Sequence, residues 1–474
     1  MHRSTIISLV LLFPENQEYF MNKQFSKEKC HPFSVGFVGF GKSNKGVYKY
    51  FKKHFPNTKF TLRAKSAPSN TEFFDRVMSG KQEFLNISED ILFLSPSVRR
   101  DITELSALSH TKAQLSSDAE YFFQNTDSDV FAVTGSDGKS TTTTLTSLML
   151  TCGYENAIPA GNIGVPLTPL LDLPNSDAIV TELSSFQLMY LKPKSRRCVI
   201  TNITENHLNW HKSFDEYISA KSNILDRTDE IIINFDCHIS RKLIKNRNVF
   251  AVFSTAASEK ELRDSVKAEI YITKKNSDII LSGDVAMSTD KMIIKGEHNV
   301  KNFMAAIAMS HGFCSRDERE AIASSFGGLP HRCEYVCTAN GVNFINSSID
   351  SSPKRTVATL AMLSEKTVLI LGGQSKGLDY SELILSLGEN IRNIVITGEN
   401  RNEILNSINF LRPELIPITL CVDGFYDAID AAIKKALPGD TVILSPASTS
   451  FDSFSNFEER GNAFKEYVKR CTGI

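Results

Sequence analysis

The sequence predicts an α/β protein with mostly parallel sheets, organised as three domains. Short apolar runs alternate with helical patterns along most of the chain, and several runs end directly in a polar or glycine-rich loop. The length of 474 residues is enough for two to four domains with ample core. Ligands of open α/β sheets bind at the carboxyl ends of the strands, so the loops after the apolar runs are the candidate sites.

Nine apolar runs have the length and composition of buried strands. They are residues 34–40, 91–94, 130–133, 178–182, 199–203, 231–235, 367–371, 393–397 and 441–444. A polar stretch over 109–120 separates the first two runs from the middle group, and Gly-Gly-Leu-Pro at 327–330 separates that group from the last. We therefore expect domains at 34–117, 118–328 and 329–474, with a hinge at Gly327 and Gly328.

Residues 1–33 precede the first predicted strand. Residues 6–13 are apolar after Arg3, as in a signal peptide, but residues 14–18 lack a small-residue cleavage site. We expect an extra segment that is disordered or lies before the true start, with Met21 as the alternative start. No other run approaches the roughly 20 apolar residues of a membrane span, so membrane insertion is not expected.

The overall charge and the cysteines exclude several classes of protein. Lys plus Arg number 53 and Asp plus Glu 54, for a net charge of -1, so nothing global attracts nucleic acid or anionic lipid. The nine cysteines are scattered, and Cys333 and Cys337 are too isolated from other Cys or His pairs to suggest a zinc site. The sequence indicates a reduced, cytoplasmic protein.

A glycine-rich loop follows the apolar run at 130–133. It reads Thr134-Gly135-Ser136-Asp137-Gly138-Lys139-Ser140 and precedes a helical pattern over 141–152. Glycines let backbone N–H groups close on phosphate oxygens, Lys139 can reach the outer phosphates, and a hydroxyl of Ser140 or Thr141 can ligand Mg²⁺. Val133 stands where the full pattern has a glycine, so this is a shortened variant, and a decorated turn is the alternative. The motif indicates a nucleotide triphosphate site.

A second glycine turn follows the first apolar run, as Gly39-Phe40-Gly41-Lys42-Ser43-Asn44. A dinucleotide fingerprint has a third Gly or Ala where Asn44 stands, so a redox cofactor is disfavoured. The same turn suits a nucleotide diphosphate, since a helix start binds any pyrophosphate. Ser95 directly follows the run 91–94 and is therefore a second polar residue at the carboxyl end of a predicted strand.

Three further residues of the middle domain carry chemistry. Glu182 ends a strand, where it could hold Mg²⁺ beside the phosphate loop or could cap a helix. His207 follows another strand and is either a ligand or a structural histidine. Lys221 lies on a helical pattern over 214–225 and, taken alone, is a solvated lysine.

These residues, in this order, resemble the Mur ligases, ATP-dependent amide-forming enzymes of bacterial cell-wall precursor synthesis. The resemblance runs from about Val35 to the C-terminus and rests on five blocks in family order. The blocks are Gly161-Asn162-Ile163-Gly164, Glu182 to Leu188, Leu329 to Glu334, Leu371 to Gly377, and Ser445 to Asp452 with its extension through Phe454, Phe457 and Arg460-Gly461. The last block is typical of the family member that adds D-glutamate.

The resemblance implies a role for each matching position. The catalytic positions are Lys139, Glu182, His207 and Lys221, and the metal positions are Ser140, Glu182, His207 and Lys221. The ATP positions are Gly135, Ser136, Asp137, Gly138, Lys139, Ser140, Thr141, Asn299, Asn302, Arg332 and Asp350. The substrate positions are Lys42, Ser43 and Ser95 on the uridine side, Asn162 in the substrate or phosphate region, and Lys376, Ser450, Phe451 and Phe457 on the D-glutamate side. Lys221 matches the lysine that the family carbamylates, which would let it ligand a second Mg²⁺.

The fold that the resemblance implies is a Rossmann-like UDP-binding domain, a central phosphate-loop ATPase domain and a Rossmann-like C-terminal domain. The implied reaction is the addition of D-glutamate to UDP-N-acetylmuramoyl-L-alanine through an acyl phosphate, with ATP and two Mg²⁺ ions. Every reactant except the amine is anionic, so the site must neutralise charge and align groups. We expect a monomer whose third domain closes onto the second.

Three positions depart from the family's commoner pattern. Asp137 stands where Asn is frequent, so its charge must point outward or be paired. Asn206 stands where an aspartate often precedes the histidine. Two residues after Asp350, where many members have lysine, the chain has Ser352, and either Lys354 or Thr356 is a candidate replacement, although Pro353 alters the local path.

Two rival functions remain. A folylpolyglutamate-synthase-like ligase shares the central and last domains and would bind a pterin, but the domain before position 118 argues against it. A catalytically silent nucleotide-binding homologue is the other, and the intact Lys139, Glu182, His207, Lys221 and Lys376 argue against that.

Overall fold

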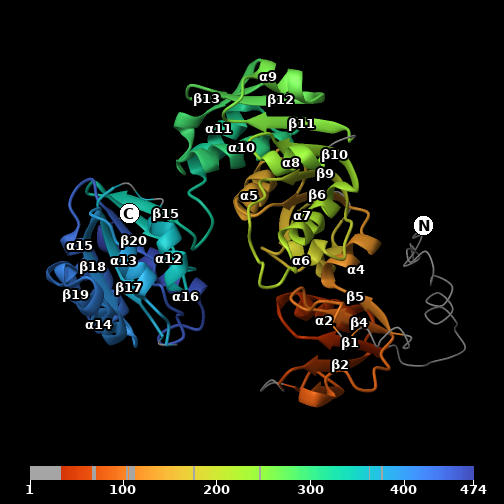
Figure 1. The fold of residues 1–474 in the computed structure, drawn as a ribbon, viewed down its shortest axis with the longest axis horizontal. Helices are drawn as coiled ribbons and strands as arrows, with labels where there is room; N and C mark the ends of the chain where they lie inside the picture. Colours follow the sequence, from red (N-terminus) through yellow and green to blue (C-terminus); the bar gives the residue numbers. More distant parts are fainter. Residues whose placement is uncertain are drawn as a thin grey trace, which may run out of the picture. The chain divides into compact units, whose positions relative to one another are not determined.

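The computed structural model describes residues 34–66, 71–102, 105, 113–174, 177–244, 247–361, 363, 365–374 and 377–473. The segment 1–33 and Lys376 therefore lie outside the described residues. Three sheets follow one another along the chain, each mostly parallel and flanked by helices, which confirms the predicted α/β class (Figure 1). The first two sheets belong to one compact unit, and the third to a second unit that comprises Met292–Ile294 and Ala323–Ile474. The domain limits at 117/118 and 328/329 stay predictions.

The first sheet is parallel throughout, in the order β3-β2-β1-β4-β5. Its elements are β1 (Ser34–Val38), α2 (Lys42–His54), β2 (Lys59–Ala64), β3 (Arg76–Ser79), the 3₁₀ turn η1 (Gly80–Gln82), β4 (Ile91–Leu94) and β5 (Gln114–Ser116). The strand order reverses at β1, which lies between β2 and β4, and Val38 pairs with Leu94. The turn after β1 and Ser95 after β4 therefore meet at one edge of the sheet.

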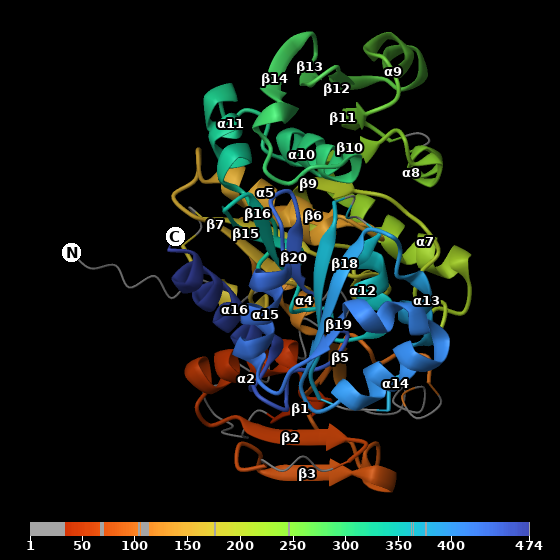
Figure 2. The same cartoon turned by 90° about the vertical axis from the view of Figure 1, so that its left-hand side faces the viewer.

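The second sheet has nine strands in the order β14-β13-β12-β11-β10-β9-β6-β8-β7. The strands are β6 (Asp129–Thr134), β7 (Ala157–Gly161), β8 (Ala178–Glu182), β9 (Lys194–Ile200), β10 (Arg227–Asn234), β11 (Val249–Ser254), β12 (Ala268–Lys275), β13 (Asp278–Leu281) and β14 (Asp284–Ser288). The helices are α4 (Asp118–Asn125), α5 (Lys139–Leu150), α6 (Ser185–Leu188), α7 (Phe214–Ser222), α8 (His238–Leu243), α9 (Glu259–Ser265), α10 (Glu297–Met309) and α11 (Arg316–Ser325), with 3₁₀ turns η3 (Thr168–Asp172), η4 (Asn223–Leu225) and η5 (Thr289–Lys291). Only β13 and β14 are antiparallel to their neighbours. Helices α5 and α10 lie side by side (Figures 1 and 2).

The third sheet has the order β15-β16-β20-β17-β18-β19. Its strands are β15 (Glu334–Ala339), β16 (Val342–Asn346), β17 (Thr367–Gly372), β18 (Ile391–Thr397), β19 (Thr419–Cys421) and β20 (Thr441–Leu444). Its helices are α12 (Pro353–Leu360), α13 (Ser381–Ser386), α14 (Arg401–Leu411), α15 (Phe425–Lys435) and α16 (Phe457–Thr472), with the 3₁₀ turn η6 (Pro413–Ile418). Two apolar clusters cover this sheet, one including Leu369 and Ile404 and the other including Val368 and Phe464.

All nine predicted strands are present, and the runs 91–94, 178–182 and 441–444 have the predicted bounds. The run 199–203 is the least accurate, since β9 spans Lys194–Ile200. The charged residues at the start of β9 do not have the apolar pattern of a buried strand, so the sequence did not indicate them. One of them, Arg197, is nevertheless buried, and its guanidinium donates to the carbonyls of Met309 and His311. The helix expected from 141 begins two residues earlier, at Lys139. Within the described ranges, no helix is both long and apolar enough to cross a membrane.

Candidate active site

The glycine-rich loop joins β6 to α5 and is braced by the end of the neighbouring strand β9. The backbone N–H groups of Ser136 and Asp137 donate to Asn202 Oδ1 at 3.1 and 2.8 Å. The hydroxyl of Thr201 donates to the carbonyl of Asp137 at 2.6 Å. Thr134 pairs with Ile200 in the sheet, so the residues after β9 emerge directly beside the loop. The loop is therefore a constrained turn at the carboxyl edge of the sheet, where ligands bind in α/β folds.

Gly138 caps α5 in the left-handed region, with a φ of 76°. A Cβ atom there would stand 2.3 Å from Asn302 Oδ1 on α10, so only glycine fits. Lys139 Nζ donates to the carbonyl of Ser136 at 2.8 Å, across the loop. The side chain of Asp137 is exposed, which agrees with the outward orientation that its charge requires. A helix N-terminus with a lysine beside it is a ready site for phosphate oxygens.

Glu182 lies next to the loop because β8 pairs with β6, with Val133 opposite Glu182. Its side chain is buried, and its two carboxylate oxygens accept from Ser140 Oγ and from Asn162 Nδ2, each at 2.6 Å. The helix-capping alternative for Glu182 is wrong, because the hydroxyl of Ser184 caps α6 in a capping box with Gln187. Glu182 is thus a carboxylate held against the hydroxyl of the phosphate loop.

Lys221 is buried, with 1% of its surface exposed, so its interpretation as a solvated lysine is wrong. Its amine donates to the carbonyl of Gly135 at 2.7 Å and to Thr134 Oγ1 at 3.3 Å, and it lies 4.8 Å from the centre of the Tyr217 ring. Burial, followed by the charge of Lys139, lowers the pKa of Lys221 well below its ordinary value. The environment therefore favours the neutral amine.

His207 lies in the exposed loop after β9, with a φ of 55°. Burial and the charges of Lys139 and Lys221 lower the pKa of His207, so the imidazole favours its neutral form. The histidine with a structural environment is instead His211, which is buried and has its Nε2 2.9 Å from Ser185 Oγ. His207 therefore lies within the electrostatic reach of both lysines, as a metal ligand or a base would.

Helix α10 brings Asn302 to the phosphate loop, and Asn299 is hydrogen-bonded to Asn302. Asn302 is buried, and its Oδ1 accepts from Thr142 on α5 at 3.3 Å. The amide of Asn302 also donates to Asn299 Oδ1 at 3.2 Å. Thr141 is half-buried in the first turn of α5. The structure thus gathers the predicted ATP positions of the central domain around one loop.

The turn after β1 opens onto a pocket of about 550 Å³. The lining residues are Val38, Gly39, Phe40, Gly41, Lys42, Ser43, Ala64, Lys65, Glu83, Ser95, Pro96, Ser97, Val98 and Phe186. The three predicted uridine-side residues, Lys42, Ser43 and Ser95, therefore line one pocket. Asn44 replaces the missing third glycine with a buried amide that donates to the carbonyl of Gly39 at 2.7 Å.

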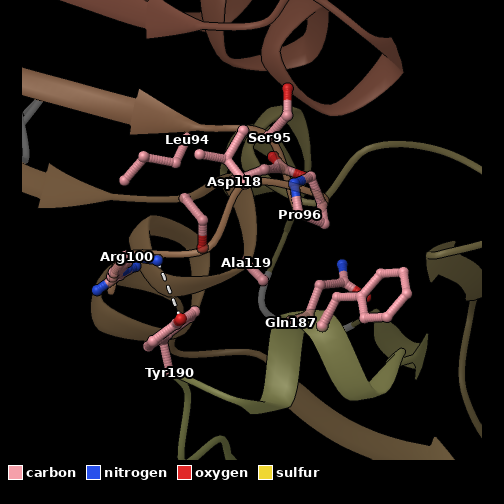
Figure 3. Close-up of a pocket in the computed structure, with 11 residues that line it drawn as sticks. Leu94, Ser95, Pro96, Arg100, Asp118, Ala119, Gln187 and Tyr190 are labelled. Carbon is pink, nitrogen blue, oxygen red and sulfur yellow. Dashed lines mark hydrogen bonds between the residues drawn. The ribbon is translucent and has the colours of Figure 1, made fainter. Parts of the chain in front are cut away.

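The wall of this pocket continues into a small cavity formed with α6 (Figure 3). Ser95, Pro96 and Gln187 all line this cavity, and the N–H of Arg100 donates to the hydroxyl of Tyr190 at 3.0 Å. The amine of Lys42 donates to the carbonyl of Gly164, in the loop that also carries Asn162. Residues of the first sheet are thus in direct contact with loops of the second.

In the third domain, Asp350 is buried and accepts from Thr359 Oγ1 at 2.8 Å and Ser445 Oγ at 2.7 Å. Of the candidate replacements for the family lysine, Thr356 is buried against Ser445 at 3.0 Å. Lys354 is exposed, and Ser352 is the N-cap residue of α12. Only Thr356 therefore belongs to the polar cluster around Asp350.

The remaining predicted residues of this domain differ in how exposed their side chains are. Ser450 is buried, Phe457 is half-buried at the start of α16, and Arg332 is exposed. Phe451 is 58% exposed. Phe457 packs its ring edge against His331, with centroids 6.0 Å apart.

Several residues around the loop were not predicted from the sequence. Asn202 braces the phosphate loop, and Tyr217 joins Ser136 through hydroxyls 2.7 Å apart. Arg99 donates to Glu216 on α7 at 2.9 Å, and Trp210 Nε1 donates to the carbonyl of Ser97 at 2.9 Å. The position of Asn202 directly after a strand was an available signal, but its adjacency to the loop depends on the strand order.

A phosphate loop, a carboxylate against its hydroxyl and a buried lysine behind it define an α/β enzyme that acts on a nucleotide triphosphate. Comparison with known families agrees: residues 133–310 match the Mur ligase middle domain, and residues 331–448 match the Mur ligase glutamate ligase domain. The chain belongs to the Mur ligase family and is an ATP-dependent ligase.

Two curated relatives carry the name UDP-N-acetylmuramoylalanine–D-glutamate ligase. The protein from Ruminiclostridium cellulolyticum is 40% identical over 390 residues, which cover 80% of this chain and 82% of that protein. The protein from Clostridium novyi is 34% identical over 472 residues, which cover 96% of this chain and 98% of that protein.

Two solved structures share the fold at low identity. The UDP-N-acetylmuramate-alanine ligase from Thermotoga maritima gives a TM-score of 0.52 at 16% identity and covers 93% of this chain and 100% of that one. A UDP-N-acetylmuramoyl-L-alanyl-D-glutamate–2,6-diaminopimelate ligase gives 0.51 at 14% identity, with 92% of each chain covered. These two similarities support the three-domain architecture alone.

Proposed function

We propose that this ligase joins D-glutamate to UDP-N-acetylmuramoyl-L-alanine in peptidoglycan precursor synthesis, with hydrolysis of ATP to ADP and phosphate. The observation that carries the proposal is the cluster of Ser140, Glu182 and Lys221 at the phosphate loop, in a chain whose relatives bear the name of that reaction. The cytoplasm is the proposed location, and all eight described cysteines are free.

The donor set at the loop fits Mg²⁺, which prefers oxygen ligands. Ser140 Oγ and Glu182 Oε2 lie 2.6 Å apart and would both turn toward the ion, while Asn162 holds the other carboxylate oxygen. His207 would supply a neutral imidazole. Bound Mg²⁺ neutralises charge on the phosphates and on the acyl group.

Lys221 fits the proposed carbamylation because its environment favours the neutral amine, which is the form that attacks carbon dioxide. The new N–C bond would convert the neutral amine into a carbamate, which carries one negative charge, and would release one proton. That carboxylate is the proposed ligand of a second Mg²⁺ ion. Gly135 and Thr134, which now accept from the amine, would keep the side chain aligned.

In the proposed reaction the substrate carboxylate attacks the γ-phosphorus of ATP, and ADP leaves. The amine of D-glutamate then attacks the acyl carbon to give a tetrahedral intermediate and loses one proton to solvent, and phosphate leaves as the amide bond forms. Lys139 and the first N–H groups of α5 would hold the phosphates, with Asn299 and Asn302 on the nucleotide side. The chemistry therefore depends mainly on positioning and on charge neutralisation.

We assign the two organic substrates to the outer domains. The pocket of about 550 Å³ that Lys42, Ser43 and Ser95 line offers one amine and two hydroxyl groups to a nucleotide diphosphate. Ser450, Phe451, Phe457 and Lys376 are the proposed D-glutamate residues, and Arg332 and Asp350 the proposed nucleotide-side residues of the third domain. A monomer is the proposed working form.

The test is phosphate release from ATP by the purified chain, with each substrate omitted in turn. We expect release only when UDP-N-acetylmuramoyl-L-alanine and D-glutamate are both present, with one new amide per phosphate by mass spectrometry. L-glutamate in place of D-glutamate is the stereochemical control. Activity with L-glutamate and a folate, or ATP hydrolysis that is indifferent to both substrates, would contradict the proposal.

A further inference from the structure

Two cysteines lie together at the ends of α5 and α10 that are remote from the phosphate loop. Cys152 follows α5, Cys314 follows α10, and their sulfur atoms are 3.5 Å apart. Helices of 12 and 13 residues separate this pair from the loop by about 18 Å, at 1.5 Å per residue. The pair is thus outside the reaction centre described above.

A third potential ligand completes the group. A carboxylate oxygen of Glu318, in the first turn of α11, and the two sulfur atoms all lie within 4.8 Å of one another. Cys314 is buried, Cys152 is half-buried and Glu318 is exposed, so the group has one open side. The N–H and hydroxyl of Ser315 donate to Glu318 Oε2, each at 2.7 Å, which fixes the carboxylate in place.

Arg319 is a positively charged residue next to these three groups. Its side chain is 8% exposed, and its buried Nε has no hydrogen-bond partner among the described residues. Burial is the largest influence on both thiols and raises their pKa, and the charge of Arg319 acts in the opposite direction. Two thiolates and one carboxylate carry three negative charges, which Arg319 and one divalent cation would balance.

The geometry fits a soft cation better than a disulfide. Bonds of about 2.3 Å from sulfur to zinc in a tetrahedron place two sulfurs somewhat less than 4 Å apart, close to the distance observed here. A disulfide needs the sulfurs to approach to about 2 Å and makes no use of Glu318. Thiolate ligands select zinc-class ions over the Mg²⁺ that oxygen ligands prefer.

We propose that Cys152, Cys314 and Glu318 form a binding site for one zinc-class divalent cation, with water at the open fourth position. The ion would displace the thiol protons as it binds, because coordinated thiols are deprotonated. It would join the ends of the two helices whose other ends hold the phosphate loop and Asn302. Its role is to stabilise the central domain.

The test is a cobalt titration of the whole chain under anaerobic, reducing conditions, after treatment with a chelator and in excess Mg²⁺. Cobalt(II) is the probe because its thiolate complexes absorb in the near ultraviolet, whereas cobalt on oxygen ligands does not give that band. We expect one equivalent of cobalt to produce the band and Zn²⁺ to displace it. Zn²⁺ should also raise the unfolding temperature.

Three variants and one control locate the ion. Cys152→Ala and Cys314→Ser should abolish the band, and Glu318→Gln should keep it while weakening cobalt binding about tenfold. Cys421→Ala removes an exposed cysteine of the other compact unit and should bind cobalt like the parent. Because Cys314 is buried, the half-buried Cys152 and the exposed Glu318 provide the decisive variants if Cys314→Ser unfolds. A band that persists in Cys152→Ala, no thiolate band at all, or conversion to a Cys152–Cys314 disulfide without cobalt affinity would overturn the proposal.

Discussion

Two strand–turn–helix units of this protein share a local pattern but differ in their surroundings. The turn between β1 and α2 carries Gly39 and Gly41, and the loop between β6 and α5 carries Gly135 and Gly138. The first turn opens onto a pocket of about 550 Å³, and a Cβ on Gly41 would meet no atom within 4 Å. In the second loop, a Cβ on Gly138 would stand 2.3 Å from a side chain of another helix. A glycine turn after a strand thus indicates a phosphate site without indicating its chemistry.

The lysines of the two units differ in the same way. Lys42 is exposed, whereas the phosphate loop has a second lysine, Lys221, buried behind it. A buried amine next to a carboxylate can change its charge state during a reaction, whereas an exposed amine binds an anion as a fixed charge. We therefore expect the central unit to govern turnover and the N-terminal unit to govern substrate affinity.

The largest expected effect is a loss of kcat on substitution of Lys221, which substitution of Lys42 should not cause. Lys221→Ala should lower kcat by about 10³-fold or more, because it removes the proposed ligand of a metal that stabilises transition-state charge. Short carboxylic acids should partly restore activity by replacing the carbamate. Lys42→Ala should instead raise the KM for the UDP substrate about tenfold, the loss of one charged hydrogen bond, with kcat nearly unchanged. Steady-state kinetics with each substrate varied will distinguish them, and equal losses in kcat would contradict the comparison.

Glu182→Gln should have the next largest effect, and the size of that effect should depend on the Mg²⁺ concentration. The amide keeps the shape but loses the charge that holds the ion, so the Mg²⁺ concentration for half-maximal activity should rise about 10- to 100-fold. The measurement is phosphate release against Mg²⁺ concentration. Glu205→Gln, an exposed glutamate on the loop before His207, is the matched control and should leave the curve in place. An unchanged curve for Glu182→Gln would remove Glu182 from the metal site.

Gly138→Ala and Gly41→Ala test the crowding of the two turns directly. The first substitution places a Cβ against Asn302 in a left-handed conformation and should cost about 1–3 kcal/mol of stability, with weaker ATP binding. The second enters open space at a φ of -77° and should change stability by less than about 0.5 kcal/mol. Urea unfolding of both variants gives the two values. Similar values for the two would show that the neighbours of the loop do not constrain it.

Asp137→Asn should have the smallest effect. The carboxylate is exposed and near the proposed phosphate site, so its removal should lower the KM for ATP about twofold at low salt, and the gain should shrink as salt screens the charge. Asp284→Asn, an exposed aspartate on β14, is the control for net charge. A gain that persists at high salt would indicate that Asp137 acts through loop conformation.

Part of the site was predictable because its signals are local. The phosphate loop and Glu182 at a strand end were predicted as separate motifs, whereas the asparagines of α10 were predicted only from the family resemblance. The nature of Lys221 was not predictable from the residues around it, since its helical pattern alone indicates a solvated side chain. Its burial depends on α7 packing toward the end of β6, a contact between distant segments.

The residues that were not predicted also depend on contacts between distant segments of the chain. Asn202 and Tyr217 contact the loop only because β9 neighbours β6 and α7 lies beside them. No short stretch of sequence determines the order of the strands in a sheet. The pair Cys152 and Cys314 lies 162 residues apart along the chain and is brought together by the packing of α5 on α10.

The sequence by itself determined the α/β class, the nine main strands, the phosphate loop and the family, because hydrophobic periodicity and motif chemistry act over a few residues. The tertiary structure alone decided that Glu182 is paired with Ser140, that Lys221 is buried, that the N-terminal turn opens to a pocket and that two remote cysteines meet. Those outcomes depend on strand order and helix packing, since burial and the charges of neighbours fix the protonation and the ligands of a side chain.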